Sequence, residues 1–212
     1  MNDKDAPQDD TQQAPPALAD IEFESLGRFT VLNPQTAEPT LQQPEPAPFK
    51  LGEDAPLQRF SHPDQARAHP LAMLQQARHS INLYSPDLEP WLYNHSAVEQ
   101  ALRAFLLANP RNRLRILLKD SSRAIKEGHR LIALARRLPS NCQIRKLNPH
   151  YPIDDQCALL IDECGVLLRT GADPYNGYAL YNEPARLRQR LELFTQSWES
   201  SISDPDLRSF LL

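Results

Sequence analysis

Short strand-like and helix-like apolar patterns alternate along residues 64–203, and this alternation restricts the fold more than any other feature of the sequence. The segments at 80–85 (SINLYS) and 114–118 (LRILL) have the length and apolar content of strands, whereas residues 182–200 place apolar side chains at helical spacing. The predicted order, β-α-β-α-β-β-β-α, favours an α/β fold in which a mixed sheet is flanked by helices on both faces.

Capping and turn residues set the expected boundaries of these elements. Ser96 and Glu99 have the spacing of a capping box, in which each side chain binds the other residue's backbone amide. The turn at 162–165 separates two strand-like runs and predicts a hairpin. Further strands are predicted at 142–147, 157–161 and 166–168, and further helices at 64–78, from about 121 to Leu138, and after a cap at Asn182.

Composition divides the chain near residue 64. Eleven of the twenty prolines lie in residues 1–70, and residues 1–64 carry twelve acidic against four basic side chains, a net charge of −8. The whole chain carries −4, so the remainder carries +4. We therefore predict a disordered, acidic Pro/Gln-rich leader over 1–63, a folded domain over 64–203 and a tail over 204–212.

An apolar island at residues 21–32 interrupts the leader. It is expected either to pair with the domain as a short strand or to dock on a protein partner. The three cysteines show no CxxC spacing, which favours a reducing compartment over a disulfide scaffold or a zinc site. No secretory signal and no window of the ~18 apolar residues that a membrane span needs is found. We expect a cytoplasmic protein without a membrane partner, and we predict neither a metal nor a cofactor.

The element order, ending in a hairpin and a helix that carries Phe194 and Trp198, resembles one half of the phospholipase D superfamily over roughly residues 66–200. Members of that family carry His-x-Lys-x4-Asp on the first hairpin strand, and Gly-Ser-x-Asn follows the aspartate after six residues. The resemblance implies a histidine that attacks phosphorus, and a lysine and an asparagine that hold the phosphate oxygens.

This sequence departs from the motif at its reactive positions. With Asp162 at the motif's aspartate, Asp155 stands at the histidine position and Cys157 at the lysine position. Gly-Ser-x-Asn falls on residues 169–172, where Thr170 replaces serine. An anionic Asp155 repels a phosphodiester and Cys157 supplies no cationic donor, so these positions are vestigial and no catalytic residue is predicted.

Two alternatives to this interpretation stay open. In the first, the chain is an unrelated α/β domain in which Asp162 only begins a turn. In the second, it is an altered phosphodiesterase or phosphatase. His150 does not replace the missing nucleophile, because its spacing puts Pro152 at the lysine position and Cys157 at the aspartate position. The resemblance also implies a homodimer, since single-half members of the family pair to complete their site.

Basic residues are concentrated in residues 111–146, where eleven cations stand against two acids. A net charge of +9 over this length predicts a surface that contacts phosphate groups. The alternative is a solvated helix face that balances the acidic leader. The residues expected to share faces of a strand and of the following helix are Arg113, Arg115, Arg123, Lys126, Arg130 and Arg137.

Tyr175 and Tyr178 follow the hairpin and are candidates for stacking on a base, although half-buried packing is the alternative. These features together favour a non-catalytic phospholipase-D-like module that binds RNA, DNA or another phosphorylated polyanion. The second hypothesis is a protein-interaction or regulatory domain with a docking leader, and the third is the altered phosphodiesterase.

Overall fold

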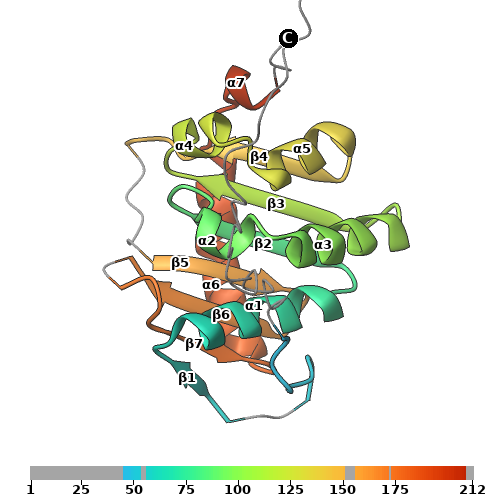
Figure 1. Cartoon of the computed structure of the whole chain (residues 1–212), viewed down its shortest axis with the longest axis vertical. Coiled ribbons are helices and arrows are strands. Elements are labelled where there is room, and N and C mark those ends of the chain that lie inside the picture. The colour runs from blue at the N-terminus through green and yellow to red at the C-terminus, as the bar shows by residue number, and fades with distance from the viewer. Residues whose placement is uncertain (1–44, 54–55, 151–155, 172, 209–212) are drawn as a thin grey trace, which may run out of the picture. The chain divides into compact units, whose positions relative to one another are not determined.

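The computed structural model describes residues 45–53, 56–150, 156–171 and 173–208. These residues form one sheet with the strand order β1-β7-β6-β5-β2-β3-β4 (Figure 1). Strands β2, β3 and β4 pair in parallel and the other pairs are antiparallel, so the sheet is mixed, as predicted. The strands are β1 (Gln58–Phe60), β2 (Ser80–Ser85), β3 (Arg113–Leu118), β4 (Cys142–Lys146), β5 (Gln156–Ile161), β6 (Gly165–Thr170) and β7 (Gly177–Leu180).

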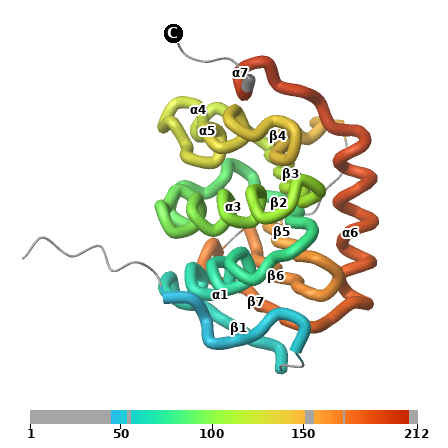
Figure 2. The backbone as a smooth tube through the Cα atoms, turned by 90° about the vertical axis from the view of Figure 1, so that its right-hand side faces the viewer, coloured from blue at the N-terminus to red at the C-terminus, as the bar shows by residue number. Residues whose placement is uncertain are grey.

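Helices cover both faces of the sheet, which confirms the predicted fold class (Figure 2). One face carries α1 (Pro63–Gln76), α3 (Ser96–Ala108) and α5 (Arg130–Arg137), and the other face carries α6 (Pro184–Glu199). Because side chains alternate along a strand, neighbouring sheet residues enter different cores. The core under α1, α3 and α5 contains Leu83, Ile116 and Leu159, whereas the core under α6 contains Leu117, Leu160, Val166, Phe194 and Trp198.

The single helix predicted over about 121–138 is wrong. The structure has α4 (Ser122–Lys126) and α5 there, separated by a short break. Gly128 lies in the break with a φ of 63°, a left-handed conformation that glycine adopts without steric cost. His129 then caps α5 with its imidazole Nδ1, which accepts a backbone N–H at 3.2 Å. The phase of the side chains on α4 therefore does not continue into α5.

The predicted helix caps also differ from the structure. Ser96 is the first residue of α3, and no side chain caps that helix. Glu99 binds Arg130 of α5 across 3.1 Å instead of closing a capping box. Helix α6 begins at Pro184, two residues after the expected cap. Proline suits this first position because its missing N–H would have no partner within the helix.

The folded body begins upstream of the predicted boundary at residue 64. Strand β1 pairs with β7 and buries Phe60, which is 3 % exposed. Still earlier in the chain, the ring of Phe49 lies 5.8 Å from that of His69 and 5.2 Å from that of Tyr181. Part of the predicted leader therefore belongs to the sheet and its core, because these aromatic groups gain from burial.

The body also extends into the predicted tail at 204–212. Helix α7 (Pro205–Arg208) places Leu207 in the core under α5. Arg136 of α5 donates to the carbonyl oxygens of Asp206 and Leu207, both at 3.1 Å. The tail is thus tied to α5 as far as the structure describes it.

Candidate functional site

Asp162, at the aspartate position of the vestigial motif, has a structural role. Asp162 lies in the turn after β5 with a φ of 51°. Its carboxylate accepts hydrogen bonds from the backbone N–H groups of Arg78, His79 and Ser80 at 2.7–2.9 Å. These bonds join the hairpin turn to the start of β2. Asp162 is therefore occupied in holding the backbone, which agrees with the turn interpretation of this residue.

Of the other vestigial positions, the structure describes Cys157 and Thr170. Cys157 is buried on β5, where desolvation and the neighbouring Glu89 raise the pKa of its thiol to about 12, so the thiol stays neutral. Thr170 is exposed and donates to the carbonyl oxygen of Asp173 at 3.3 Å. Asp155, at the histidine position, lies outside the described residues, as does the apolar island at 21–32.

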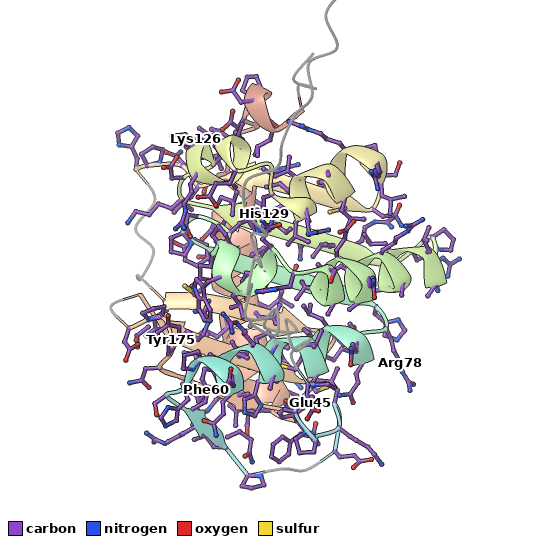
Figure 3. All side chains as sticks on the ribbon, in the orientation of Figure 1. Glu45, Phe60, Arg78, Lys126, His129 and Tyr175 are labelled. Atoms are coloured by element: carbon purple, nitrogen blue, oxygen red, sulfur yellow. The ribbon has the colours of Figure 1, made fainter. Side chains whose placement is uncertain are left out.

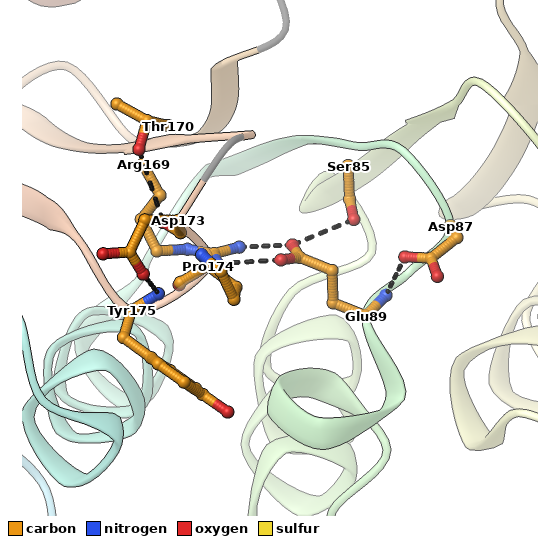
Figure 4. Close-up of polar contacts among 8 residues, drawn as sticks. All are labelled: Ser85, Asp87, Glu89, Arg169, Thr170, Asp173, Pro174 and Tyr175. Carbon is orange, nitrogen blue, oxygen red and sulfur yellow. Dashed lines mark hydrogen bonds and ion pairs between the residues drawn. The ribbon is translucent and has the colours of Figure 1, made fainter.

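A buried ion pair lies beside these positions and was not predicted from the sequence (Figure 4). Arg169 of β6 donates to both carboxylate oxygens of Glu89, with 2.8 Å between Nη1 and Oε1. The side chains are 0 % and 9 % exposed, respectively. Ser85 donates to the same carboxylate at 3.1 Å, and Arg169 also donates to the carbonyl oxygen of Pro174 at 2.8 Å. Both charges are therefore paired and hydrogen-bonded inside the protein.

The loop after β2 adopts an unusual backbone conformation, which places the side chain of Glu89 beside Arg169. Leu88 and Glu89 have φ values of 64° and 35°, in a region that costs non-glycine residues free energy. The carboxylate of Asp87 accepts the N–H of Glu89 at 3.0 Å. The carbonyl of Glu89 in turn accepts the N–H groups of Leu92 and Tyr93, in the short helix α2 (Pro90–Tyr93). These bonds hold the strained loop in place.

Electrostatics favour the charged form of Arg169 despite its burial. Desolvation acts to lower its pKa, but the hydrogen bonds and the negative charge of Glu89 outweigh it, so the pKa of Arg169 lies above its usual range. Burial also raises the pKa of the Tyr93 hydroxyl, which stays neutral. The Nε of Arg169 has no hydrogen-bond partner among the described atoms. The pair thus has one polar atom left unsatisfied.

Aromatic rings cover the ion pair. The Cζ atom of Arg169 lies 5.5 Å from the centroid of the Trp91 ring, and that of Arg67 lies 5.8 Å from the same ring. Tyr175 meets Trp91 edge-on, with centroids 5.0 Å apart and an angle of 80°. Tyr175 is therefore engaged in this cover, with 37 % of its surface exposed. Both the carboxylate and the guanidinium are thus almost completely buried.

The two tyrosines proposed to stack a base do not lie together. Tyr175 belongs to the loop before β7 and covers the ion pair (Figure 3). Tyr178 stands on β7 and packs against the core under α6, on the opposite face of the sheet. The two tyrosines therefore do not share one platform, and stacking on a base by either of them stays a prediction.

The helical cations do not form the continuous stripe that was predicted. Arg123 is bound at 3.0 Å by both Asp87 and Glu127, and Arg130 is bound by Glu99. These carboxylates neutralise two of the four predicted charges, and the break at Gly128 separates α4 from α5. Lys126 (Figure 3) and Arg137 are both exposed, and their binding to phosphate stays a prediction.

The strand arginines share one face of β3, as the alternation predicts. Arg113 is exposed and Arg115 is half-buried, and both lie on the side covered by α6. Arg145 of β4, which was not among the predicted phosphate-binding residues, lies on the same face. Arg115 donates through Nε to the side-chain oxygen of Asn82 at 2.8 Å. This face therefore carries cations whose contacts are aromatic and neutral groups.

A close pairing of Glu89 with Arg169 had one signal in the sequence. Arg169 follows three apolar residues in the strand-like run Val166–Leu168, and a long cation on a buried strand requires a partner. The sequence alone does not identify that partner, because 80 positions separate the two residues. Within the described residues, no group of three or more His, Cys, Asp or Glu side chains is arranged to hold a metal ion.

A family model described as a domain of unknown function, DUF7931, matches residues 62–210. The chain belongs to this family. The matched residues extend from just before α1 to just after α7, so they include both members of the buried ion pair. No curated protein matches the chain. In the part of the DUF7931 chain that the structure describes, no helix is long and apolar enough to cross a membrane.

Several solved structures are similar to the DUF7931 domain. TrmBL2, an archaeal chromatin protein whose structure shows a novel mode of DNA binding, is 17 % identical with a TM-score of 0.52, over 70 % of this chain and 54 % of its own. The chain thus spans about half the length of that protein. Nuc, a phospholipase D family member from Salmonella typhimurium, is 17 % identical with a TM-score of 0.47, over 68 % of this chain and 95 % of its own. NucT from Helicobacter pylori is 13 % identical with a TM-score of 0.47, over 70 % and 97 %. At these identities the likeness extends to the fold alone.

Proposed function

We propose that this chain is a phospholipase-D-like module that no longer hydrolyses phosphodiesters and that binds a phosphate-rich polymer, with RNA or DNA as the ligand. The observation that carries the loss of hydrolysis is the Glu89–Arg169 ion pair, whereas the charge of the body supports binding. Cys157 and Arg169 are cross-strand partners in the β5–β6 register. A guanidinium thus stands next to the position where the resemblance implies a lysine.

The carboxylate of Glu89 accepts the hydrogen bonds of this guanidinium that a phosphate ligand would otherwise accept. Arginine forms paired hydrogen bonds with carboxylate and with phosphate oxygens alike. Phosphate bound here would have to displace Glu89 and leave its charge buried without a partner, which costs several kcal/mol. The vestigial site is therefore closed from within, and the neutral thiol of Cys157 supplies no replacement for the lysine.

The charge of the body supports a polyanionic ligand. Residues 65–212 carry +4 beside −8 in residues 1–64, and eleven of the cations fall in residues 111–146. An excess of cations on one unit of a domain attracts nucleic acid through its phosphates, independently of base sequence. TrmBL2, which shares the fold, is a DNA-binding protein. The likeness is one of fold, so the proposal rests on this chain's own charges.

Loss of hydrolysis is tested with a chromogenic diester. Purified protein should cleave bis-nitrophenyl phosphate, RNA and DNA no faster than a mock preparation. The Asp155→Ala variant serves as the matched control, because Asp155 occupies the nucleophile position. Hydrolysis by the natural protein that disappears in Asp155→Ala would establish an altered phosphodiesterase in place of a binding module.

Nucleic-acid binding is tested by mobility shift with single-stranded RNA and DNA at low salt. We expect binding at micromolar protein that weakens linearly on a logarithmic salt axis, because binding releases counterions. Scrambling the base sequence should leave the affinity unchanged, since backbone contacts carry no sequence information. The absence of any shift would favour the protein-interaction hypothesis.

A further inference from the structure

In the part of the chain that the structure describes, two half-buried arginines lie together on the α6 face of the sheet and have no carboxylate partner. Arg115 of β3 is opposite Gln143, and Leu117 is opposite Arg145 of β4. The two guanidinium groups therefore extend from adjacent parallel strands toward the same helix. Within the described residues, no carboxylate oxygen lies within 4 Å of either guanidinium, in contrast to Arg130.

Aromatic rings of α6 hold both guanidinium groups in place. The Cζ atom of Arg145 lies 4.7 Å from the centroid of the Trp198 ring. The Cζ atom of Arg115 lies 5.6 Å from the same ring and 5.4 Å from Phe194. These two rings are stacked, with centroids 5.9 Å apart and an angle of 18°. Contact with a ring face engages the plane of a guanidinium and leaves the N–H groups at its edge for an anion.

Arg113 adds a third charge on the same face. It lies two residues before Arg115 on β3, which is roughly 6.6 Å along a strand. Its Nη1 donates to the carbonyl oxygens of Pro110 and Asn112 at 2.8 and 2.9 Å, so neutral groups orient it and its charge is not cancelled. Figure 2 shows α6 running past β3 and β4 on this side of the sheet.

The positive charges of Arg115 and Arg145 repel each other. Desolvation and the field of Arg145 lower the pKa of Arg115. Two cations held close without an anion raise the energy of the free protein, and a bound anion relieves this repulsion. The helical cations differ in this respect, because Arg123 and Arg130 already have carboxylate partners.

We infer that Arg113, Arg115 and Arg145, the β3–β4 arginine cluster, bind successive phosphate groups of a nucleic-acid strand on the α6 face of the sheet. This inference rests on the proposed function and gives it a site, on the opposite face of the sheet from the closed Glu89–Arg169 pair. The cluster fixes phosphates by charge-assisted hydrogen bonds and reads no base sequence.

The test compares two double charge reversals in the full-length protein. Arg113→Glu with Arg145→Glu changes the cluster, and Arg78→Glu with Arg103→Glu makes the same change in net charge at exposed positions outside residues 111–146. Binding to a fluorescein-labelled oligothymidylate is followed by anisotropy at several salt concentrations. We expect the cluster variant to lose at least roughly tenfold in affinity and to reduce the salt slope by about 1.4, the value for two lost contacts to a single strand. The control variant should change affinity less than about threefold.

The possible results separate the site from the function. Equal losses in both variants, or none in the cluster variant, would overturn the cluster while nucleic-acid binding stands. If the natural protein binds no oligonucleotide, the proposed function fails, and calorimetric titration with pyrophosphate tests the cluster alone. Pyrophosphate binding lost in the cluster variant then supports the anion site, and its absence overturns both. Arg113→Gln with Arg145→Gln, checked by thermal melting, replaces the reversal if that variant does not fold.

Discussion

Removing one member of the Glu89–Arg169 pair should destabilise the protein far more than removing both. Arg169→Met leaves the carboxylate of Glu89 buried without its cation, and Glu89→Gln leaves a fully buried guanidinium without its anion. Loss of one partner of a buried pair costs about 3–5 kcal/mol. At ~2–4 °C per kcal/mol for a domain of this size, each single variant should lower Tm by roughly 6–20 °C.

The double variant Glu89→Leu with Arg169→Met removes the unpaired charge together with the pair. Its free energy of unfolding should lie within about 2 kcal/mol of the natural protein, since apolar replacement of buried ion pairs is often neutral. Arg130→Met is the matched control, because its ion pair with Glu99 is half exposed and contributes within about 1 kcal/mol. Urea unfolding measures all four variants.

The reasoning depends on coupling between the two side chains. A double variant as unstable as the sum of the two singles would show that each side chain acts through its own packing. A single variant that costs less than about 1 kcal/mol would show that water or rearrangement solvates the remaining charge. Either result would remove the basis for a site closed from within.

Three further predictions concern pH, the leader and self-association. Burial lowers the pKa of His129 to about 4, so the unfolded chain binds the proton at a higher pH than the folded protein does. The free energy of unfolding should therefore fall as pH drops from about 6.5 toward 4, by up to roughly 1.4 kcal/mol per pH unit. The variant His129→Asn keeps an oxygen at the N-cap and should reduce this pH dependence, as measured by urea unfolding at each pH. Residues 1–44 carry eight acids against Lys4 and Arg28, a net charge of −6, so deleting them should strengthen oligonucleotide binding severalfold at low salt in the anisotropy assay; unchanged affinity would exclude competition by the leader. Light scattering at tens of micromolar should show a homodimer, and a strict monomer would contradict that expectation.

The sequence predicted the layered fold because its signals are local. Alternation along β2 and β3 assigns Leu83 and Leu117 to different cores, and the apolar spacing of α6 marks the face that carries Phe194 and Trp198. The strands β1 and β7 were missed because three or four residues are too few for a periodic pattern. The break at Gly128 was missed because a single glycine inside a helical pattern is often tolerated.

The candidate site was harder to predict because it depends on contacts between distant segments. The vestigial motif directed attention to the correct strands, β5 and β6, and to the loss of a cation at Cys157. The partner of Arg169 is evident only from the structure, in which the loop after β2 adopts a left-handed backbone and places Glu89 beside the guanidinium. Similarly, the charge count located the basic segment, but carboxylates on other elements decide which cations remain unpaired.

Restoring a lysine at the vestigial position should therefore fail for a reason that the motif alone does not give. Cys157 faces Arg169 across the hairpin, and Glu89 already binds that guanidinium. In Cys157→Lys a second buried cation would compete for one carboxylate, so we expect a loss of several kcal/mol in stability and no hydrolysis of a chromogenic diester. Cys157→Ser, which adds no charge, is the matched control and should unfold close to the natural protein. If Cys157→Lys is as stable as Cys157→Ser, the carboxylate accommodates two cations or the lysine reaches solvent. The ion pair would then not be what keeps a phosphate-binding lysine out of this site.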